Sequence, residues 1–315
     1  MKRFIKNIIY FIIPFIIYLI IIIIIDPYNY LNINKENNTN NNIAENIEPH
    51  LFRLIDFQNN PKKNIILGDS RSNGLFRNIS SNNWSNLSCG GSSLKEIIQT
   101  FWWATSEKEQ IDTIIIGISF NLYNKYNKRF WIEETLERKK NFFSYAFNKY
   151  TFQSTLSILK SYFVKVNIIN KKQNLSKEEY WEYVINQVSA KFFEKYAYPE
   201  KYYQELNNIS KYCIQNKIKL ICWIPPTHIE FQNKIFDFNL KTNNSKFISD
   251  MKKIGELYNY NYINPLTIEK NNFGDPMHSR DTILKIIYSE IFNNKPYYAI
   301  HSQVQLTTTN KPNAR

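Results

Sequence analysis

The hydrophobic and polar positions of the chain fall into three successive patterns. Ile8–Ile25 is an apolar run without a charged side chain, residues 27–50 are rich in asparagine, and from Leu51 onward short apolar runs alternate with helical patterns. As a helix with a rise of about 1.5 Å per residue, the first run would be roughly 27 Å long, close to the hydrocarbon thickness of a bilayer. We therefore predict a cytoplasmic N-terminus and transmembrane signal anchor over 1–26, followed by a linker over 27–50.

The charges that flank this run predict its orientation. Lys2, Arg3 and Lys6 precede the apolar residues, and Asp26 follows them. Positive residues stay on the cytoplasmic side, so we expect a single-pass protein of the inner (cytoplasmic) membrane with a periplasmic or extracellular C-terminal domain. A cleaved signal peptide is the alternative. It would need a shorter apolar core and a small-residue cleavage site, and the run ends instead in "IIIDPYNY".

The region from Leu51 onward predicts an α/β fold. Continuous β-branched runs such as Asp112–Ser119 and Ile218–Pro226 are typical of buried parallel strands. Further strands are predicted at 63–67, 86–89 and 260–264, with helices between them. This alternation favours an α/β three-layer sandwich with a five-stranded parallel sheet over residues 51–298.

Two segments depart from the alternating pattern. Residues 120–217 lack strand signals and carry helical ones, so we predict a helical insertion between the third and fourth strands. Residues 299–315 end in "HSQVQLTTTNKPNAR" and are predicted to be a polar tail.

The composition restricts the possible partners. The formal net charge of +13 favours anionic partners. With the predicted topology, these would be phospholipids or envelope polymers and not nucleic acid, although many lysines would simply form a solvated surface. The three cysteines, Cys89, Cys213 and Cys222, form no CxxC pair and no metal-type cluster. We expect buried thiols, no metal and no cofactor.

Residues with chemical potential follow each predicted strand. Gly68-Asp69-Ser70 follows the first strand, Gly90-Gly91-Ser92 the second, and Asn121 the third. His228 follows the fourth strand, and Asp275 and His278 follow the fifth. The carboxyl ends of parallel strands meet at one edge of the sheet, which is where open α/β sheets bind their ligands.

These residue types suit acyl transfer by a serine nucleophile. Ser70 would attack, His278 would take its proton, and Asp275 would orient the imidazole. The backbone N–H groups of Ser70 and Gly91 and the amide of Asn121 would stabilise the oxyanion. Each pattern alone is more often a turn, a cap or a surface histidine. Their occurrence in order at strand ends strengthens the joint interpretation.

The chain resembles the SGNH (GDSL-type) hydrolase superfamily over about 63–117 and 218–292. "GDS" (68–70) matches the first block of the family, "NLSCGGSS" (86–93) resembles the second, "IIIGISFN" (114–121) the third, and "DPMH" (275–278) the fifth. The resemblance implies an SGNH/flavodoxin-like sandwich and the roles above for Ser70, Gly91, Asn121, Asp275 and His278. Two departures stand out. Arg71 replaces the usual leucine, and the altered third block leaves Asn124 as a fallback for Asn121.

The predicted architecture also resembles envelope O-acyltransferase partners of the alginate-acetylation and teichoic-acid D-alanylation type. That resemblance implies a multi-pass membrane acyltransferase as partner and an envelope glycan as substrate. We therefore expect a serine esterase or O-acyltransferase acting on acyl, above all acetyl, esters of cell-envelope or exopolysaccharide glycans. The alternative is a non-catalytic SGNH-like protein that binds polysaccharide or scaffolds its synthesis; a basic nucleic-acid binder is a weaker third option.

Two further residues are candidates for substrate binding. Arg71 would either bind an anionic substrate or form a structural ion pair. His228 would either line the site or lie behind it or at the surface.

Overall fold

The computed structural model describes residues 2–33, 38–79, 83–108, 110–127, 131–164 and 175–304. The chain divides into two compact units. Met1–Pro61 and Trp131–Lys172 form the first, here the helical unit, and Lys62–Phe130 and Gln173–Arg315 form the second, the sheet unit. The predicted boundary at residue 51 and the single insertion over 120–217 therefore differ from the structure. The middle of the insertion belongs to the helical unit, together with the N-terminal segment.

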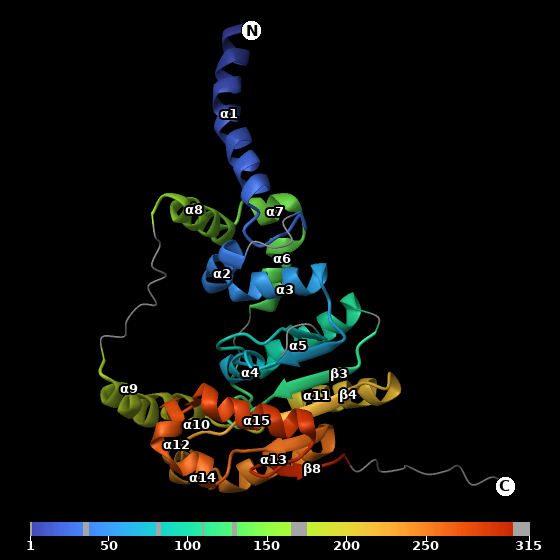
Figure 1. Ribbon diagram of the computed structural model, residues 1–315, viewed down its shortest axis with the longest axis vertical. Coiled ribbons are helices and arrows are strands. Elements are labelled where there is room, and N and C mark those ends of the chain that lie inside the picture. The colour runs from blue at the N-terminus through green and yellow to red at the C-terminus, as the bar shows by residue number, and fades with distance from the viewer. Residues whose placement is uncertain are drawn as a thin grey trace, which may run out of the picture. The chain divides into compact units, whose positions relative to one another are not determined.

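The helical unit consists of α1 (Lys2–Ile25), α2 (Asn38–Ile47), α3 (Pro49–Asn59), α6 (Ile132–Lys139), α7 (Phe142–Ala146) and α8 (Lys149–Phe163), seen in Figure 1. The predicted linker over 27–50 contains α2 and the start of α3. Its asparagines conceal helical spacing, because Ile43 and Ala44 are buried, as is Leu51 one helix later. Ala44 and Leu51 pack in one core with Ile22.

The apolar N-terminal run lies in α1. Side chains are described for Tyr10 and for 12–25, so part of the predicted span over Ile8–Ile25 lies outside the described residues. Among the residues that are described, no helix is long and apolar enough to cross a membrane. The predicted transmembrane helix is therefore not confirmed. The last turns of α1 pack within the unit, where Ile22 and Ile25 are buried.

The sheet unit contains β1 (Asn64–Leu67), β2 (Trp84–Asn86), β3 (Thr113–Gly117), β4 (Lys219–Ile224), β5 (Glu256–Asn259) and β8 (Ile300–Ser302). The strand order is β2-β1-β3-β4-β5-β8. The first five are parallel, and β8 pairs antiparallel with β5. The predicted α/β class and parallel sheet are confirmed.

The predicted number of five strands is wrong, because the segment read as a polar tail contributes the sixth strand of this sheet. The pairing of β8 is supported by side chains: His301 Nε2 lies 2.9 Å from Glu256 Oε1. The His301 ring also lies 4.6 Å from that of Tyr258. The remainder of the tail, 305–315, lies outside the described residues.

Helices cover both faces of the sheet. On one face α4 (Ser70–Phe76) packs against α15 (Asp281–Asn293), and on the other α11 (Glu200–Gln215) packs against both α5 (Leu94–Glu107) and α13 (Lys241–Ile254). The core of the first face includes Ile66, Ile115, Trp223 and Ile287. The unit also contains α9 (Lys177–Tyr183), the π-helix η2 (Val184–Val188), α10 (Ser189–Phe193), α12 (Ile229–Asp237), α14 (Pro265–Ile268), the 3-10 turn η3 (Lys270–Asn272) and the hairpin β6 (Phe273–Asp275) and β7 (His278–Ser279).

All three cysteines are free and buried, as the sequence predicts. Burial raises the pKa of both Cys213 and Cys222 to about 12. At neutral pH these thiols are therefore protonated and behave as small apolar side chains.

Candidate active site

The turn from β1 to α4 exposes the hydroxyl of Ser70. Gly68 has a φ of 145°, which strains any residue with a side chain, and a Cβ there would also overlap Ser72 Oγ. Asp69 caps α4 by accepting a hydrogen bond from the Arg71 N–H at 2.9 Å. Because Ser70 is the first residue of α4, its N–H has no acceptor within the helix. The turn therefore offers a hydroxyl and a free backbone donor at one residue.

The β6–β7 hairpin brings a histidine and a carboxylate to Ser70. His278 Nε2 lies 2.7 Å from Ser70 Oγ, although the two residues are 208 positions apart. On the other side of the ring, His278 Nδ1 lies 2.8 Å from Asp275 Oδ2. The three predicted catalytic residues are thus brought together in hydrogen-bonding order.

The environment of Asp275 keeps its carboxylate ionised. Burial raises the pKa of Asp275, but hydrogen bonds and charge from His278 outweigh that effect and leave the pKa below its ordinary value. The Met277 N–H also donates to Asp275 Oδ1 at 2.8 Å. An ionised carboxylate on Nδ1 holds the imidazole in the tautomer whose Nε2 can accept a proton from Ser70.

The glycine turn after β2 lies beside the serine. A Cβ built on Gly90 would lie 4.0 Å from Ser70 Cβ, and Gly91 has a φ of 78°. The Cys89 N–H donates to Gly68 O at 3.1 Å, which ties this turn to the end of β1. Within the described part of the chain, the Gly91 N–H donates no hydrogen bond. It is therefore available to a ligand next to Ser70.

A buried arginine orients the third predicted oxyanion donor. Arg71 Nη2 donates to Ser119 Oγ at 2.6 Å and to Asn121 Oδ1 at 3.3 Å. Ser119 Oγ donates to the same oxygen of Asn121 at 2.7 Å. With its carbonyl fixed by these donors, the Asn121 side chain keeps its amide hydrogens for another acceptor.

The other side of the Arg71 guanidinium is paired with Asp69. Arg71 Nε donates to Asp69 Oδ2 at 2.9 Å, and Nη2 forms a shorter ion pair with the same carboxylate. Burial raises the pKa of Asp69, but the charge and hydrogen bonds of Arg71 leave it below its ordinary value. Of the two roles weighed for Arg71, the geometry fits the structural ion pair.

The fallback residue, Asn124, is fully engaged elsewhere. Its Nδ2 donates to Phe192 O at 3.0 Å, and its Oδ1 accepts from the N–H groups of Tyr126 and Ala197 at 3.1 Å and 3.2 Å. These bonds hold the chain around residues 192–197. The geometry therefore favours Asn121 over Asn124 as the side-chain donor.

His228 lies behind the site. It is 3% exposed, and its Nδ1 caps α12 by accepting from the Glu230 N–H at 3.3 Å. Burial lowers the pKa of His228, which favours this neutral, accepting form. The backbone N–H of His228 donates to Pro276 O at 2.8 Å, so His228 fixes the loop between Asp275 and His278.

Two residues that the sequence did not single out, Ser72 and Trp223, support the turn at Ser70. Ser72 Oγ accepts a hydrogen bond from Trp223 Nε1 at 3.2 Å. A Cβ on Gly117 would overlap both of these groups. The sequence signal for this arrangement is Gly117, which ends an otherwise β-branched strand. Its lack of a side chain leaves room for the Ser72 hydroxyl and the Trp223 indole.

The cavity at Ser70 is small. Its volume is about 50 Å³, and its lining includes Ser70, His278, Trp223, Pro225 and Leu284. One water molecule needs at least about 10–15 Å³ of such space, so the cavity has room for a small group.

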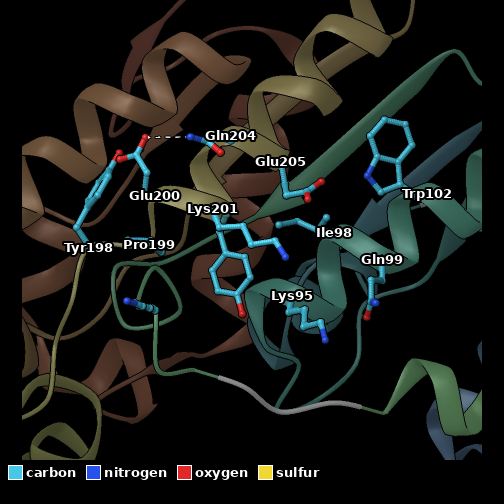
Figure 2. A pocket seen from close by; sticks show the side chains of 12 residues that line it. Lys95, Ile98, Gln99, Trp102, Tyr198, Pro199, Glu200, Lys201, Gln204 and Glu205 are labelled. Atoms are coloured by element: carbon cyan, nitrogen blue, oxygen red, sulfur yellow. Dashed lines mark hydrogen bonds between the residues drawn. The ribbon is translucent and has the colours of Figure 1, made fainter.

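A larger groove of about 1120 Å³ lies between α5 and α11. Figure 2 shows Lys95 and Trp102 of α5 across from Lys201 and Glu205 of α11. Tyr198 and Tyr202 also line the groove. It combines aromatic faces with charged and amide groups. Because α5 begins at Leu94, the groove starts a few residues after Gly91.

Among the described residues, no group of three or more His, Cys, Asp or Glu side chains could hold a metal ion.

Neither a protein-family model nor a curated protein sequence matches the chain. Among solved structures, it is similar to a candidate acylhydrolase of Bacteroides fragilis, with 11% identity over 75% of this chain and 86% of that one and a TM-score of 0.39. A GDSL-like lipase of Bacteroides thetaiotaomicron matches at 10% identity over 74% and 87%, with a TM-score of 0.38. A candidate lipolytic protein of the G-D-S-L family from Desulfitobacterium hafniense matches at 10% identity over 74% and 99%, with a TM-score of 0.37.

Proposed function

We propose that this protein is a serine esterase or O-acyltransferase that acts on short acyl esters, above all acetyl esters, of cell-envelope or exopolysaccharide glycans. The observation that carries the proposal is the continuous hydrogen-bonded line from Ser70 through His278 to Asp275, at 2.7 Å and 2.8 Å. The roles are those implied by the resemblance to SGNH-type hydrolases.

In the proposed reaction, Ser70 Oγ attacks the ester carbonyl carbon while His278 Nε2 takes the hydroxyl proton. His278 then gives this proton to the departing alkoxide, which leaves as an alcohol. The acyl group remains on Ser70 as an ester. A second hydroxyl, from water or from a glycan, loses its proton to His278 and attacks the acyl carbon. Ser70 is released with its proton restored. Asp275 stabilises the imidazolium in both halves of the reaction.

The oxyanion of each tetrahedral intermediate would be held by the N–H groups of Ser70 and Gly91 and by the Asn121 amide. Losing one such donor typically lowers kcat by about 100-fold to 1000-fold. The geometry supports this assignment because the carbonyl of Asn121 is fixed by Arg71 and Ser119.

The two cavities support the substrate class. The volume of about 50 Å³ beside Ser70 suits an acetyl-sized group. The groove of about 1120 Å³ would hold the glycan, with Trp102 and Tyr202 stacking on sugar rings and Lys95 and Lys201 pairing with anionic substituents.

The location and the partner are also proposals. An envelope glycan requires that the sheet unit lie outside the cytoplasm, where a multi-pass membrane acyltransferase would supply the acyl group. A topology reporter fused after Pro61 should then be active outside the cytoplasm. A reporter active only in the cytoplasm would contradict this part of the proposal and revive the nucleic-acid interpretation of the positive charge.

The catalytic proposal is tested on the purified chain with a fluorophosphonate probe and a chromogenic acetate ester. The wild type should react with the probe and hydrolyse the ester, and Ser70→Ala should do neither. Ser106→Ala is the matched control, because Ser106 is exposed on α5 and should leave both signals unchanged. A wild type that neither reacts with the probe nor hydrolyses the ester would contradict the mechanism.

The second candidate is a non-catalytic protein that binds polysaccharide. The observation that favours it is the size and aromatic lining of the groove, which needs no nucleophile to hold a glycan. Glycan binding that survives Ser70→Ala, in a wild type without esterase or transferase activity, would favour this candidate.

A further inference from the structure

In the helical unit, helix α8 has mostly polar side chains on its buried face and several apolar side chains on its exposed face. Its buried side chains are mostly polar and include Thr151, Ser154 and Thr155. Its exposed side chains include Phe152, Leu156 and Phe163, and Phe163 is 85% exposed. A helix on a water-facing surface shows the opposite arrangement, with its apolar stripe toward the core.

Hydrogen bonds fix this orientation. Ser154 Oγ lies 2.8 Å from the hydroxyl of Tyr28, which is itself buried. At the start of the helix, Asn148 Oδ1 accepts from the Thr151 N–H at 3.0 Å, and Asn148 Nδ2 donates to Thr151 Oγ1 at 3.0 Å. The Asn148 bonds fix the start of the helix, and rolling α8 to hide its aromatic side chains would break the buried bond between Ser154 and Tyr28. The outward aromatics are therefore a stable feature of the unit.

The exposed aromatic side chains of α8 continue onto its neighbours. Phe143 and Phe147, at α7, are 65% and 49% exposed. The Phe147 ring lies 6.3 Å from Phe15 and 5.5 Å from Tyr18, both on α1. An open hollow of about 500 Å³ lies here, lined by Pro14, Phe15, Tyr18, Phe147, Asn148, Lys149 and Phe152. We call the exposed faces of α1, α7 and α8 the aromatic surface; Figure 1 shows these helices.

The charges of the stretch that contains α7 and α8 have one sign, although Arg138 and Lys140 at its start pair with Glu134 and Glu137 of α6. From Arg138 to Val164 the chain contains no carboxylate, and its charged residues are Arg138, Lys139, Lys140, Lys149 and Lys160. Lys149 borders the hollow, and both Lys149 and Lys160 are exposed on α8. Phenylalanine and tyrosine beside lysine, with no acidic residue, is the composition of interfacial segments that bind anionic lipid.

We propose that the aromatic surface docks on an anionic lipid bilayer. Phe143, Phe147 and Phe152 enter the boundary between headgroups and acyl chains, and Lys149 and Lys160 lie at the headgroups. A second copy of the chain is a poorer occupant, because it would bring two stretches without carboxylates against each other. The proposal does not depend on the catalytic site, since every residue in it belongs to the helical unit.

The test measures where single side chains lie in the vesicle-bound full chain. Phe147→Cys and Phe152→Cys are each labelled with a nitroxide, and the native cysteines are buried and should react little. The vesicles contain phosphatidylethanolamine and phosphatidylglycerol in equal parts. Relaxation by lipid-soluble oxygen is compared with relaxation by a water-soluble nickel chelate, which gives the depth of each label.

Two matched labels serve as controls. Asn46→Cys is an exposed site on α2 of the same unit, and Ile263→Cys is an exposed apolar site in the sheet unit. The proposal expects oxygen to relax the labels at 147 and 152 more than the chelate does, and the reverse at 46 and 263. Binding should also be at least about tenfold weaker on vesicles of phosphatidylcholine alone.

Three outcomes would overturn the proposal. The chain could fail to float with the anionic vesicles. The labels at 147 and 152 could be as accessible to the chelate as those at 46 and 263 while the chain is bound. Dipolar broadening between labels at the same site would show that a second copy, and not lipid, covers the surface.

Discussion

Arg71 links the turn at Ser70 to the Asn121 side chain. Its guanidinium is buried and reaches Asp69, Ser119 and Asn121, so an arginine at this position has a physical role. The sequence showed Arg71 next to Ser70, but it could not show which way a long side chain turns at a helix start. That depends on Ser119 and Asn121, which are about 50 residues away in the chain.

Replacing Arg71 should therefore affect catalysis more than substrate binding. Arg71→Leu frees the Asn121 side chain to rotate, and it leaves the buried Asp69 carboxylate without its partner. We expect kcat to fall at least about tenfold with little change in KM, and the free energy of unfolding to fall by about 3 kcal/mol or more.

Steady-state kinetics on an acetate ester and urea unfolding measure the two effects. Arg71→Lys is the comparison variant, because it retains the charge and loses the planar fork of donors. It should recover stability more than kcat. Unchanged kcat in a folded Arg71→Leu variant would contradict the positioning role.

Asp69 and Asp275 predict acid sensitivity. Both have pKa values below the ordinary 3.8, so the folded chain keeps them ionised at a pH where the unfolded chain binds protons. Their contribution to stability is complete above about pH 4 and is lost as the pH falls through the lower folded values.

Urea unfolding at about pH 6, 4 and 3 should show this loss. Asp69→Asn should be less stable at pH 6 and show a shallower decline below pH 4. A decline as steep as that of the wild type would mean that Asp69 is not one of the groups responsible.

Among the elements, the buried strands were the most predictable. β1, β3 and β4 lie within the predicted ranges, because each is a run of apolar residues buried on both faces. Weaker patterns were misplaced. The fifth strand occupies Glu256–Asn259, just before the predicted Tyr260–Asn264. The asparagines of α2 hid the helical spacing of its buried Ile43 and Ala44. β8 has only three residues and takes its structure from pairing with β5.

Removal of β8 should destabilise the sheet unit. A chain that ends after Ala299 loses the antiparallel pairing with β5 and the contact between His301 and Glu256. A chain that ends after Val304 retains both and is the matched control. We expect the shorter chain to be less stable by about 2–4 kcal/mol. Differential scanning calorimetry of the two chains measures this, and equal melting temperatures would show that β8 contributes nothing.

At the scale of the whole molecule, net charge was readable from the sequence but the division of the chain was not. The insertion over 120–217 looked continuous because helical periodicity does not reveal which core a helix joins. Its residues Tyr145 and Ala146 pack with Leu51 and Ile55 in the helical unit, whereas Trp181 donates to Glu230 within the sheet unit. Contacts between segments distant in sequence decide this division.

The net charge of +13 should make the binding of polyanions dependent on salt. Long-range attraction weakens as the Debye length falls from about 10 Å at 0.1 M to about 3 Å at 1 M ionic strength. We expect the affinity for a polyuronate to fall at least about tenfold over this range, while that for a neutral glycan changes little. Isothermal titration at several salt concentrations measures both, and equal salt dependence would argue against an electrostatic contribution.

The separation of 208 positions between Ser70 and His278 also has a consequence for biosynthesis. At about 5–20 residues per second, a ribosome needs roughly 10–40 s to proceed from the serine to the histidine. Under the proposed mechanism, the nascent chain has the Ser70 hydroxyl without its base during that interval, so it does not turn over esters. A chain that terminates before the β6–β7 hairpin would then be inactive, and esterase activity would appear only in chains that extend at least through this hairpin.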